Sequence, residues 1–485
     1  MSHTTLLAIA AAGVATLLLL ILRVKVQPFV ALVVVSIGVA LAAGVPAADL
    51  VKTIEEGMGA TLGHIATIIA LGAMIGRIIE LSGGAHAFAY SLIDRFGSRR
   101  TPLALAVAGF VLGIPVFFEV GLIILMPIAY GVARASRKPL LVYALPMGAA
   151  MLTVHAFLPA HPGAVAVAEA IGASQGLMLL MGIPLMAVVV LLGYLVSRRL
   201  TRREYPVDPA VYAEVYGAPD TDEAMPSSVE ASHDTSHSPM PSESGRGAAV
   251  LTKPAIRGTD VRLPSFGMVL TLIVTPILLI LLGTIGQNTL PEGSTLRAVL
   301  TVLGAPMVAL LIDVTLCGYF LGVRRGWNRA HISEVMGSAL PPVAMVILVA
   351  GAGGVFGKVL VASGIGGAIA DVLESTGLPV LLLAFLTSLA LRAAQGSATV
   401  ALVTTAGILT PLLHRAHLST GQLSLVALAM GAGALALSHI NNAGYWMFTK
   451  LAGLDVAAGL RTWTVLTTVM GCAGFALTTM LWPLV

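Results

Sequence analysis

Charged residues are scarce in this 485-residue chain, because Asp, Glu, Lys and Arg together make up 10% of it, whereas hydrophobic residues make up 57%. A soluble domain of this length cannot bury so much apolar surface, so the composition excludes a water-soluble globular protein. Cysteine is nearly absent: Cys317 and Cys472 both lie in apolar stretches, which excludes a disulfide framework. Aromatic residues, at 5%, accompany no basic stripe, so a nucleic-acid surface is excluded as well.

Long apolar runs are what the sequence has in place of charge. Several runs of Leu, Ile, Val and Ala approach the roughly 20 residues that a helix needs to cross about 30 Å of hydrocarbon. In the first half they lie at 4–22, 28–45, 65–79 and 177–196. No basic residue precedes the first run, unlike in a secretory signal peptide, so we expect it to remain as a helix. These runs predict an all-α, polytopic membrane protein in contact with the lipid bilayer.

The chain also repeats itself. The segment GRIIELSG at 76–83 recurs as GKVLVASG at 357–364. Downstream of each copy lie apolar segments that are interrupted by polar residues. These interruptions lie at 117–121, 155–163, 392–399 and 438–444. Two membrane halves that are broken at corresponding places are typical of a secondary transporter whose substrate binds where the halves meet.

The positions of Lys and Arg predict how the chain is threaded through the membrane, because short loops rich in them stay cytoplasmic. The block 103–133 has basic residues at both ends and contains Gly113, Pro115 and Glu119, so we expect a re-entrant hairpin. The block 379–413 is the corresponding hairpin of the second half. Each half then has five crossings and one hairpin, and because five is odd, the second half is inverted. We therefore expect about ten transmembrane helices plus two re-entrant hairpins with discontinuous helices, and both termini outside.

The domain boundaries follow from the same pattern. Residues 1–196 form the first membrane repeat and residues 265–485 form the second, inverted one. Between them, residues 197–264 are polar and rich in Pro, Ser, Asp and Glu. Such a segment cannot bury enough apolar area to offset chain entropy, so we expect a largely disordered cytoplasmic linker.

Two ionisable residues lie at the predicted hairpin tips. Glu119 is the only carboxylate of its hairpin, which suits a carrier of the coupled proton, although a permanent neutralising partner such as Arg392 is the alternative. Arg392 offers a planar fork that fits the carboxylate of an anionic substrate, or else it is the structural mate of Glu119. Both alternatives stay open at the level of sequence.

The other polar residues of the interruptions are hydroxyl, amide and imidazole groups, which suit a hydroxyl-rich ligand, and glycines that let a ligand approach the backbone. The spacing of His155 and His161 does not match a helical zinc site, so we expect no metal, no cofactor and no catalytic residue. The candidate substrate-binding residues are His155, His161, Gly163, Arg392, Gln395, Gly396, Ser397, Thr399, His439, Asn441 and Asn442.

With these residues the chain resembles the GntP family of gluconate permeases, which are bacterial inner-membrane proton symporters within the ion transporter superfamily. The matching segments are GAMIG at 72–76, SGG at 82–84, FFEVG at 117–121, His155 through HPG at 161–163, QGSATV at 395–400 and NNAGYW at 441–446. The resemblance covers both halves. It implies multi-pass insertion in the inner membrane, a homodimer, and a domain that moves like an elevator.

The resulting expectation is a secondary active transporter, not an enzyme, which takes up gluconate or a related hydroxy monocarboxylate with protons by alternating access. A sodium-coupled carboxylate transporter is the nearest alternative, because carbonyls freed at broken helices can also ligate sodium. An intramembrane, metal-dependent hydrolase that uses His155, His161 and Glu119 is a further alternative from a different class.

Overall fold

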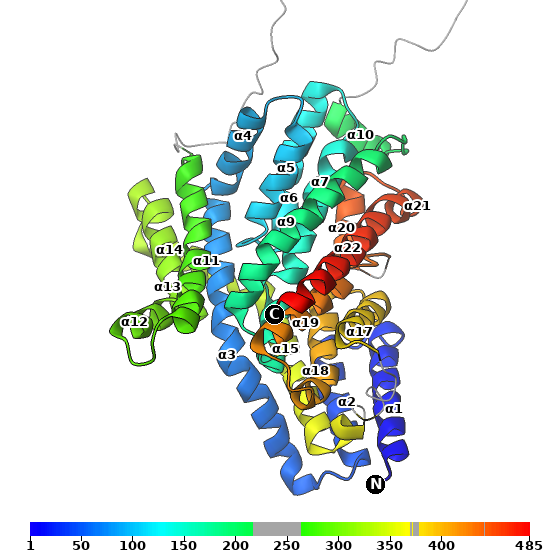
Figure 1. Ribbon diagram of the computed structural model, residues 1–485. Coiled ribbons are helices and arrows are strands. Elements are labelled where there is room, and N and C mark those ends of the chain that lie inside the picture. Colours follow the sequence, from blue (N-terminus) through cyan, green and yellow to red (C-terminus); the bar gives the residue numbers. More distant parts are fainter. Residues whose placement is uncertain (217–262, 369–370, 372–377, 441) are drawn as a thin grey trace, which may run out of the picture.

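The computed structural model describes residues 1–216, 263–368, 371, 378–440 and 442–485, and these residues are helical apart from turns, loops and one β-bridge between Val207 and Leu454 (Figure 1). The first half consists of α1 (His3–Leu22), α2 (Pro28–Ala42), α3 (Ala47–Leu81), α4 (Gly84–Phe96), α5 (Thr101–Leu112), α6 (Phe118–Ser136), α7 (Leu141–Phe157), α8 (Pro162–Ile171), α9 (Gln175–Leu200) and α10 (Pro209–Tyr216). The second half consists of α11 (Phe266–Thr289), α12 (Thr295–Leu303), α13 (Pro306–Cys317), the π-helix η1 (Gly318–Gly322), η2 (Val323–Arg325), α14 (Arg329–Ser338), α15 (Leu340–Ala362), α17 (Val380–Gln395), α18 (Ala398–Arg415), α19 (Thr420–Leu435), α20 (Ala443–Leu451), α21 (Val456–Gly459), η3 (Leu460–Thr464), α22 (Val465–Leu481) and η4 (Trp482–Leu484).

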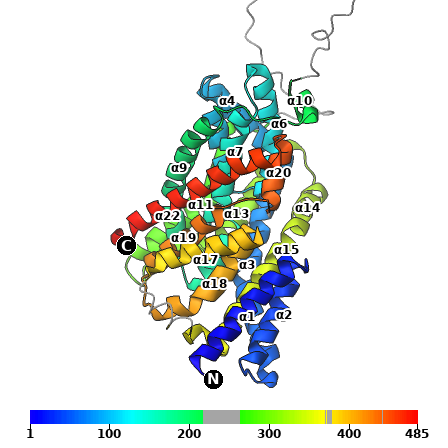
Figure 2. The same cartoon turned by 90° about the vertical axis from the view of Figure 1, so that its right-hand side faces the viewer.

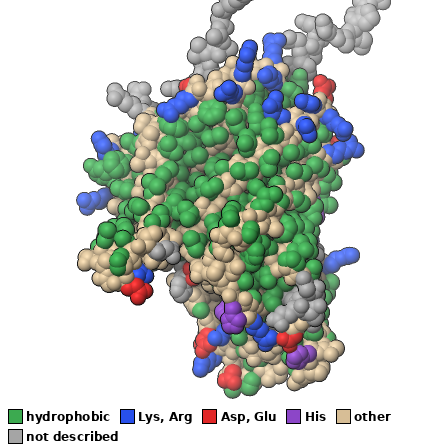
Figure 3. All heavy atoms as spheres, viewed as in Figure 1, with side chains coloured by type: hydrophobic (Ala, Val, Ile, Leu, Met, Phe, Trp, Pro, Cys, Tyr) green, Lys and Arg blue, Asp and Glu red, His purple; other side chains and the backbone are tan. Residues whose placement is uncertain are grey.

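The surface of the protein is that of a multi-pass membrane protein. Within the described residues, 9 helical segments are long and apolar enough to cross a bilayer. Large apolar side chains such as Leu191, Leu192 and Leu282 are exposed, and Figure 3 shows hydrophobic side chains over the middle of the molecule, with many Lys and Arg at its upper end. The predicted all-α polytopic class is confirmed. The count of ten spans stays a prediction.

The two halves are joined by an antiparallel pair of helices, α3 and α15. Lys358 forms an ion pair with Glu56 at 3.0 Å, and Arg77 donates a hydrogen bond from Nε to the Oγ of Ser338 at 3.1 Å. Arg77 and Lys358 occupy the same position in the two copies of the sequence repeat. Arg77 contacts the last residue of α14, just before α15, and Lys358 contacts the first part of α3. The inverted repeat stays a prediction.

The sequence interruptions are breaks between helices. In the first half the chain leaves α5 at Gly113 and starts α6 at Phe118, and it leaves α7 at Leu158 and starts α8 at Pro162. In the second half Gly396, with a φ of +81°, separates α17 from α18, because a left-handed backbone favours glycine. The discontinuous helices predicted from the sequence are confirmed. We refer to residues 113–117 as break 1 and to residues 158–161 as break 2.

Two helices differ from what hydropathy alone indicates. Asp49 and Glu55 follow the apolar run at 28–45, yet they lie on α3, which is 35 residues long. The apolar stretch at 296–321 is not one helix, because α12 ends at Leu303 and α13 starts at Pro306. A proline at the first turn of α13 favours a new start there.

Part of the predicted linker is helical. Helix α10 packs on the end of α6, where Arg134 donates a hydrogen bond from Nε to the carbonyl of Val215 at 2.6 Å. The segment before α10 contacts the second half, since Asp208 N donates to the carbonyl of Gly453 at 2.7 Å. Residues 217–262 lie outside the described residues, so the domain boundaries stay a prediction.

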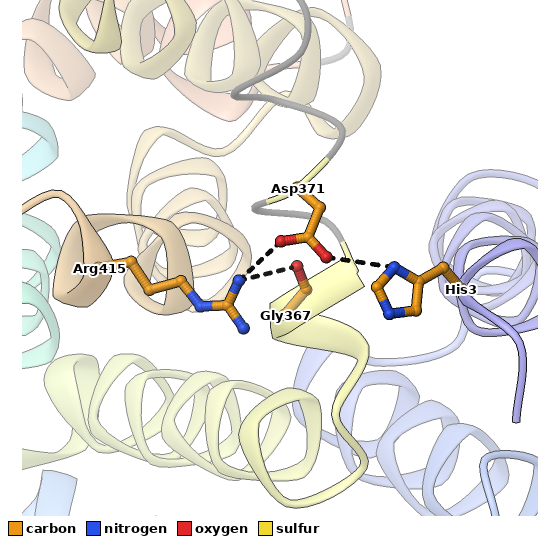
Figure 4. Close-up of polar contacts among 4 residues, drawn as sticks. All are labelled: His3, Gly367, Asp371 and Arg415. Atoms are coloured by element: carbon orange, nitrogen blue, oxygen red, sulfur yellow. Dashed lines mark hydrogen bonds and ion pairs between the residues drawn. The ribbon is translucent and has the colours of Figure 1, made fainter.

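At the end of the molecule where α1 begins, a polar cluster joins two distant helices (Figure 4). Asp371 contacts His3 Nδ1 at 3.1 Å and accepts a hydrogen bond from Arg415 at 2.8 Å. Figure 2 shows α1 and α2 beside α15 at this end of the molecule. All three side chains of the cluster are exposed, so we expect their ion pairs to contribute little to stability.

Candidate functional site

One cavity of about 540 Å³ lies where the interruptions of the two halves meet. Its walls come from the breaks of both halves, from the start of α20, and from residues of α2, α7 and α15. The lining residues include Phe117, Phe118, Glu119, His155, Pro162, Arg392, Gln395, Gly396, Ser397, Thr399 and Asn442. The hairpin tips that carry Glu119 and Arg392 therefore border the same space.

Four helices begin at this cavity. The first residues of α6, α8, α18 and α20 are Phe118, Pro162, Ala398 and Ala443, and all four line it. The backbone N–H groups of a first helical turn have no partner within the helix, and they carry a partial positive charge. The Oγ of Ser397 caps α18, whereas α6 and α8 have no side-chain cap. The N-termini of α6 and α8 therefore keep backbone N–H donors that can bind an anion.

Arg392, in the last turn of α17, supplies a full positive charge to the same space. The side chain is fully buried, and one of its nitrogens donates to the carbonyl of Gly396. The Nε and Nη2 atoms have no hydrogen-bond partner among the described residues. A buried guanidinium with two free donors on one side is arranged for bidentate binding of a carboxylate.

Two further polar side chains that line the cavity have donor or acceptor atoms that make no hydrogen bond in the described structure. Both side-chain atoms of Gln395 lack a partner in the described part of the chain, and so does Nδ1 of His155. Buried polar atoms are normally paired, so unpaired ones in residues that line a cavity indicate a ligand. Together with Arg392, they offer contacts for an anion that also carries hydroxyl groups.

Glu119 is half-buried in the first turn of α6. It lines the cavity with Arg392, and the two side chains interact electrostatically. No ion pair within 4.0 Å involves Glu119 in the ranges that the structure describes. Its charge is therefore placed to act on the cavity without being locked to the arginine.

Three predicted residues lie behind the cavity wall or away from it. His161 is buried, and its Nε2 is 2.7 Å from the carbonyl oxygen of Gly113, so it joins break 2 to break 1. The His161 ring also lies 4.8 Å, centroid to centroid, from that of His155. Gly163 is a packing residue, because a Cβ there would lie 3.1 Å from the Cα of Thr399. His439 contacts the carbonyl of Ala393 at 3.1 Å and does not line the cavity.

The remaining predicted residues belong to the start of α20. Asn442 caps this helix, since its Oδ1 accepts a hydrogen bond from the N–H of Tyr445 at 3.0 Å. Its Nδ2 donates to the carbonyl of Gly396, so it also links α20 to the tip of the second hairpin. Asn441 lies outside the described residues.

The sequence reasoning missed one buried ionisable residue. Asp313 on α13 is fully buried and lies on a separate, small cavity behind breaks 1 and 2. A signal was available, because Asp313 is the only acid in the apolar run at 296–321.

In the described residues, no three His, Cys, Asp or Glu side chains converge as ligands of a metal ion. The unpaired groups of the large cavity are nitrogen donors and amide atoms rather than a set of anionic ligands. Their chemistry suits an organic anion.

Comparisons with known proteins agree with this geometry. The profile of the GntP family permeases matches residues 4–235 and 250–485. The chain is 45% identical to the inner membrane permease YgbN of Escherichia coli K12, over 100% of both chains. It is 35% identical to a gluconate permease of Bacillus licheniformis, covering 98% of this chain and 99% of the relative. It is also 35% identical to the Gnt-II system L-idonate transporter of E. coli K12, covering 96% and 97%.

Among solved structures, the Alcanivorax borkumensis YdaH transporter has a similar fold, with a TM-score of 0.60 at 14% identity over 94% of this chain and 98% of that one. Neisseria gonorrhoeae MtrF has the same TM-score at 12% identity, with 94% of each chain covered. The resemblance inferred from the sequence motifs is thus confirmed, and the hydrolase alternative is wrong. The chain belongs to the GntP permease family and is a membrane transport protein rather than an enzyme.

Proposed function

We propose that this permease is a secondary active symporter that takes up gluconate or a related sugar acid together with protons. The single observation that carries the proposal is the buried guanidinium of Arg392, whose Nε and Nη2 have no hydrogen-bond partner among the described residues. It lies on a cavity where four helices begin. Positive charge and backbone donors favour a carboxylate there. Relatives named as gluconate and L-idonate transporters support a hydroxylated monocarboxylate as the substrate.

In this proposal the substrate carboxylate binds the free Nε and Nη2 of Arg392. The hydroxyl groups along its chain contact Gln395, Ser397, Thr399 and Asn442, which line the same cavity. The Nδ1 of His155 is a further donor or acceptor for them. His161, Gly163 and His439 act indirectly, because their contacts hold the breaks in place.

Charge balance provides a reason for proton coupling. In the empty cavity, the positive charge of Arg392 and the negative charge of an ionised Glu119 compensate each other. A bound carboxylate adds a second negative charge, which protonation of Glu119 removes. Substrate binding therefore favours proton binding. By thermodynamic linkage, proton binding must raise the affinity for the substrate by the same factor. This reciprocity makes Glu119 our choice for the carrier of the coupled proton.

Alternating access, the orientation and the oligomer are part of the same proposal. Arg134, Arg198 and Arg199 lie near the ends of α6 and α9, where many basic side chains gather (Figure 3), which supports a cytoplasmic location for this end. Both termini would then face outward, the linker would be cytoplasmic, and the inner membrane would be the location, as the name of the E. coli relative says of that protein. We keep the homodimer that the family resemblance implies as a proposal.

A thermal-shift screen of the purified protein tests the substrate class. Gluconate and other hydroxylated monocarboxylates should raise the unfolding temperature, because a ligand that binds only the folded state stabilises it. Dicarboxylates and amino acids serve as comparisons. Stabilisation by a dicarboxylate alone would reject the monocarboxylate proposal, and uptake that stops when sodium is replaced by potassium would reject proton coupling in favour of sodium.

A further inference from the structure

Asp313 lies outside the substrate cavity and has almost no polar partners. Its Oδ2 contacts the Sγ of Cys317 at 3.8 Å, and its Oδ1 has no hydrogen-bond partner among the described residues. No Lys, Arg or His of the described ranges forms an ion pair with it. An ionised carboxylate that is fully buried without a counter-charge is strongly disfavoured. The surroundings therefore favour a carboxylic acid that holds its proton.

A small cavity lies beside Asp313. Its volume of about 40 Å³ is enough for a few water molecules or one small ion. The lining residues from α3, α9, α11 and the two breaks are apolar side chains, glycine and proline, so Cys317 is the one other titratable group in contact with Asp313 in the described structure. Apart from the carboxyl group of Asp313, the side chains of this lining offer no oxygen ligand for a sodium ion. The chemistry fits a proton.

The position of this cavity links it to the substrate site. Pro115 of break 1 and Pro159 of break 2 line the Asp313 cavity. Phe117, at the other end of break 1, and Pro162, which directly follows break 2, line the substrate cavity. His161 holds the two breaks together through the carbonyl of Gly113. The breaks are thus a shared wall, with the substrate on one side and Asp313 on the other.

Break 1 comes close to α3 because Gly76 has no side chain. A Cβ at Gly72 would lie 3.7 Å from the carbonyl oxygen of Ala160, and a Cβ at Gly76 would overlap the carbonyl of Pro115. The π-helix η1 begins directly after Cys317, and such segments occur frequently at functional sites. Breaks 1 and 2 thus lie close to α3 and line the cavity beside Asp313 together with α3 and α13.

We propose that Asp313 is a second proton-binding site, separate from the substrate cavity, whose carboxyl group holds its proton while breaks 1 and 2 line the small cavity beside α13. When the breaks withdraw and water enters, the acid can give its proton to water, and the carboxylate regains one before the wall closes again. The proposal concerns proton binding at this residue, so it does not depend on gluconate being the substrate.

Infrared spectroscopy of the purified protein tests it without any substrate. At neutral pH the wild type should show absorbance of a buried, protonated carboxyl group, and Asp313→Asn should lose that band. Asp371→Asn removes an exposed, ion-paired carboxylate and should keep the band, as should Glu119→Gln, which separates the two proposed proton sites. An unchanged band in a folded Asp313→Asn protein, or no band in the wild type, would overturn the proposal.

A second variant covers the case in which Asp313→Asn does not fold. Cys317→Ser keeps the acid and replaces a weak thiol donor by a stronger hydroxyl donor. The carboxyl band should remain and shift to lower frequency, because its group now has a stronger hydrogen bond. A band at an unchanged frequency in this variant would place the protonated group elsewhere and refute the assignment to Asp313.

Discussion

Replacing Arg392 by alanine should weaken binding of the sugar acid strongly while the fold persists. In the structure the buried side chain has two nitrogens that no described residue occupies, so the substrate carboxylate can take both. The loss of a charge-assisted hydrogen bond costs about 1.5 to 3 kcal/mol, which corresponds to roughly a 10- to 150-fold rise in Kd. Arg392→Lys retains the charge but not the planar fork, so we expect an intermediate loss.

The assay is isothermal titration of the purified protein with gluconate. Arg415→Ala is a matched control, because Arg415 ends the second helix of the same hairpin but pairs with the exposed Asp371, far along α18 from the cavity. Its Kd should equal that of the wild type. If Arg392→Ala folds normally and binds gluconate with an unchanged Kd, Arg392 has a structural role only, and the proposed site is refuted.

The remaining predictions concern the packing of the breaks, the cap of α20 and the peripheral cluster. Gly76→Ala should lower the unfolding temperature and slow transport, because its Cβ would overlap the carbonyl of Pro115 at an overpacking cost of about 1–3 kcal/mol. Gly59→Ala is the control on the same helix, because a Cβ there meets open space and should be neutral or stabilising. Equal unfolding temperatures of the two variants would contradict the packing at Gly76. Asn442→Ala should destabilise the protein by about 0.5–2 kcal/mol, because the helix cap is lost, and it should also weaken substrate binding. Asn442→Asp should restore the cap, and with it the free energy of unfolding measured by denaturation. A wild-type Kd of Asn442→Ala would show that this residue does not belong to the site. Asp371→Asn should change stability by less than about 1 kcal/mol and leave uptake intact, so a transport defect there would mean that the cluster in Figure 4 matters to the cycle.

The breaks between helices could be predicted because they rest on local signals. Gly113 and Pro115 in the block 103–133 predicted the break that the structure has between α5 and α6. The re-entrant threading of this block and the inverted repeat stay predictions. The full length of α3 could not be predicted in the same way. Asp49, Glu55 and Glu56 interrupt its hydropathy, yet the helix continues, and Glu56 pairs with Lys358, which is distant in sequence.

For the candidate site, too, local sequence signals predicted some of the residues, whereas the roles of others depend on tertiary packing. Residues at a break, such as Glu119 and Arg392, are marked by the cost of charge in a membrane, and the structure places both on one cavity. His161 and His439 carry the same local signal but face backbone carbonyls of other segments, which only tertiary packing decides. Asp313 stood alone in an apolar run, and its cavity is assembled from breaks 1 and 2, which lie far away in the sequence.

The central claim is that Glu119 carries the proton that drives uptake of the sugar acid. Glu119→Gln imitates the permanently protonated residue, so gluconate should still bind, and its Kd should lose the pH dependence of the wild type. The decisive measurement compares two modes of transport by this variant in proteoliposomes. We predict that exchange between gluconate-loaded vesicles and external gluconate continues, while accumulation driven by a pH gradient stops. Undiminished gradient-driven accumulation by Glu119→Gln would contradict the account.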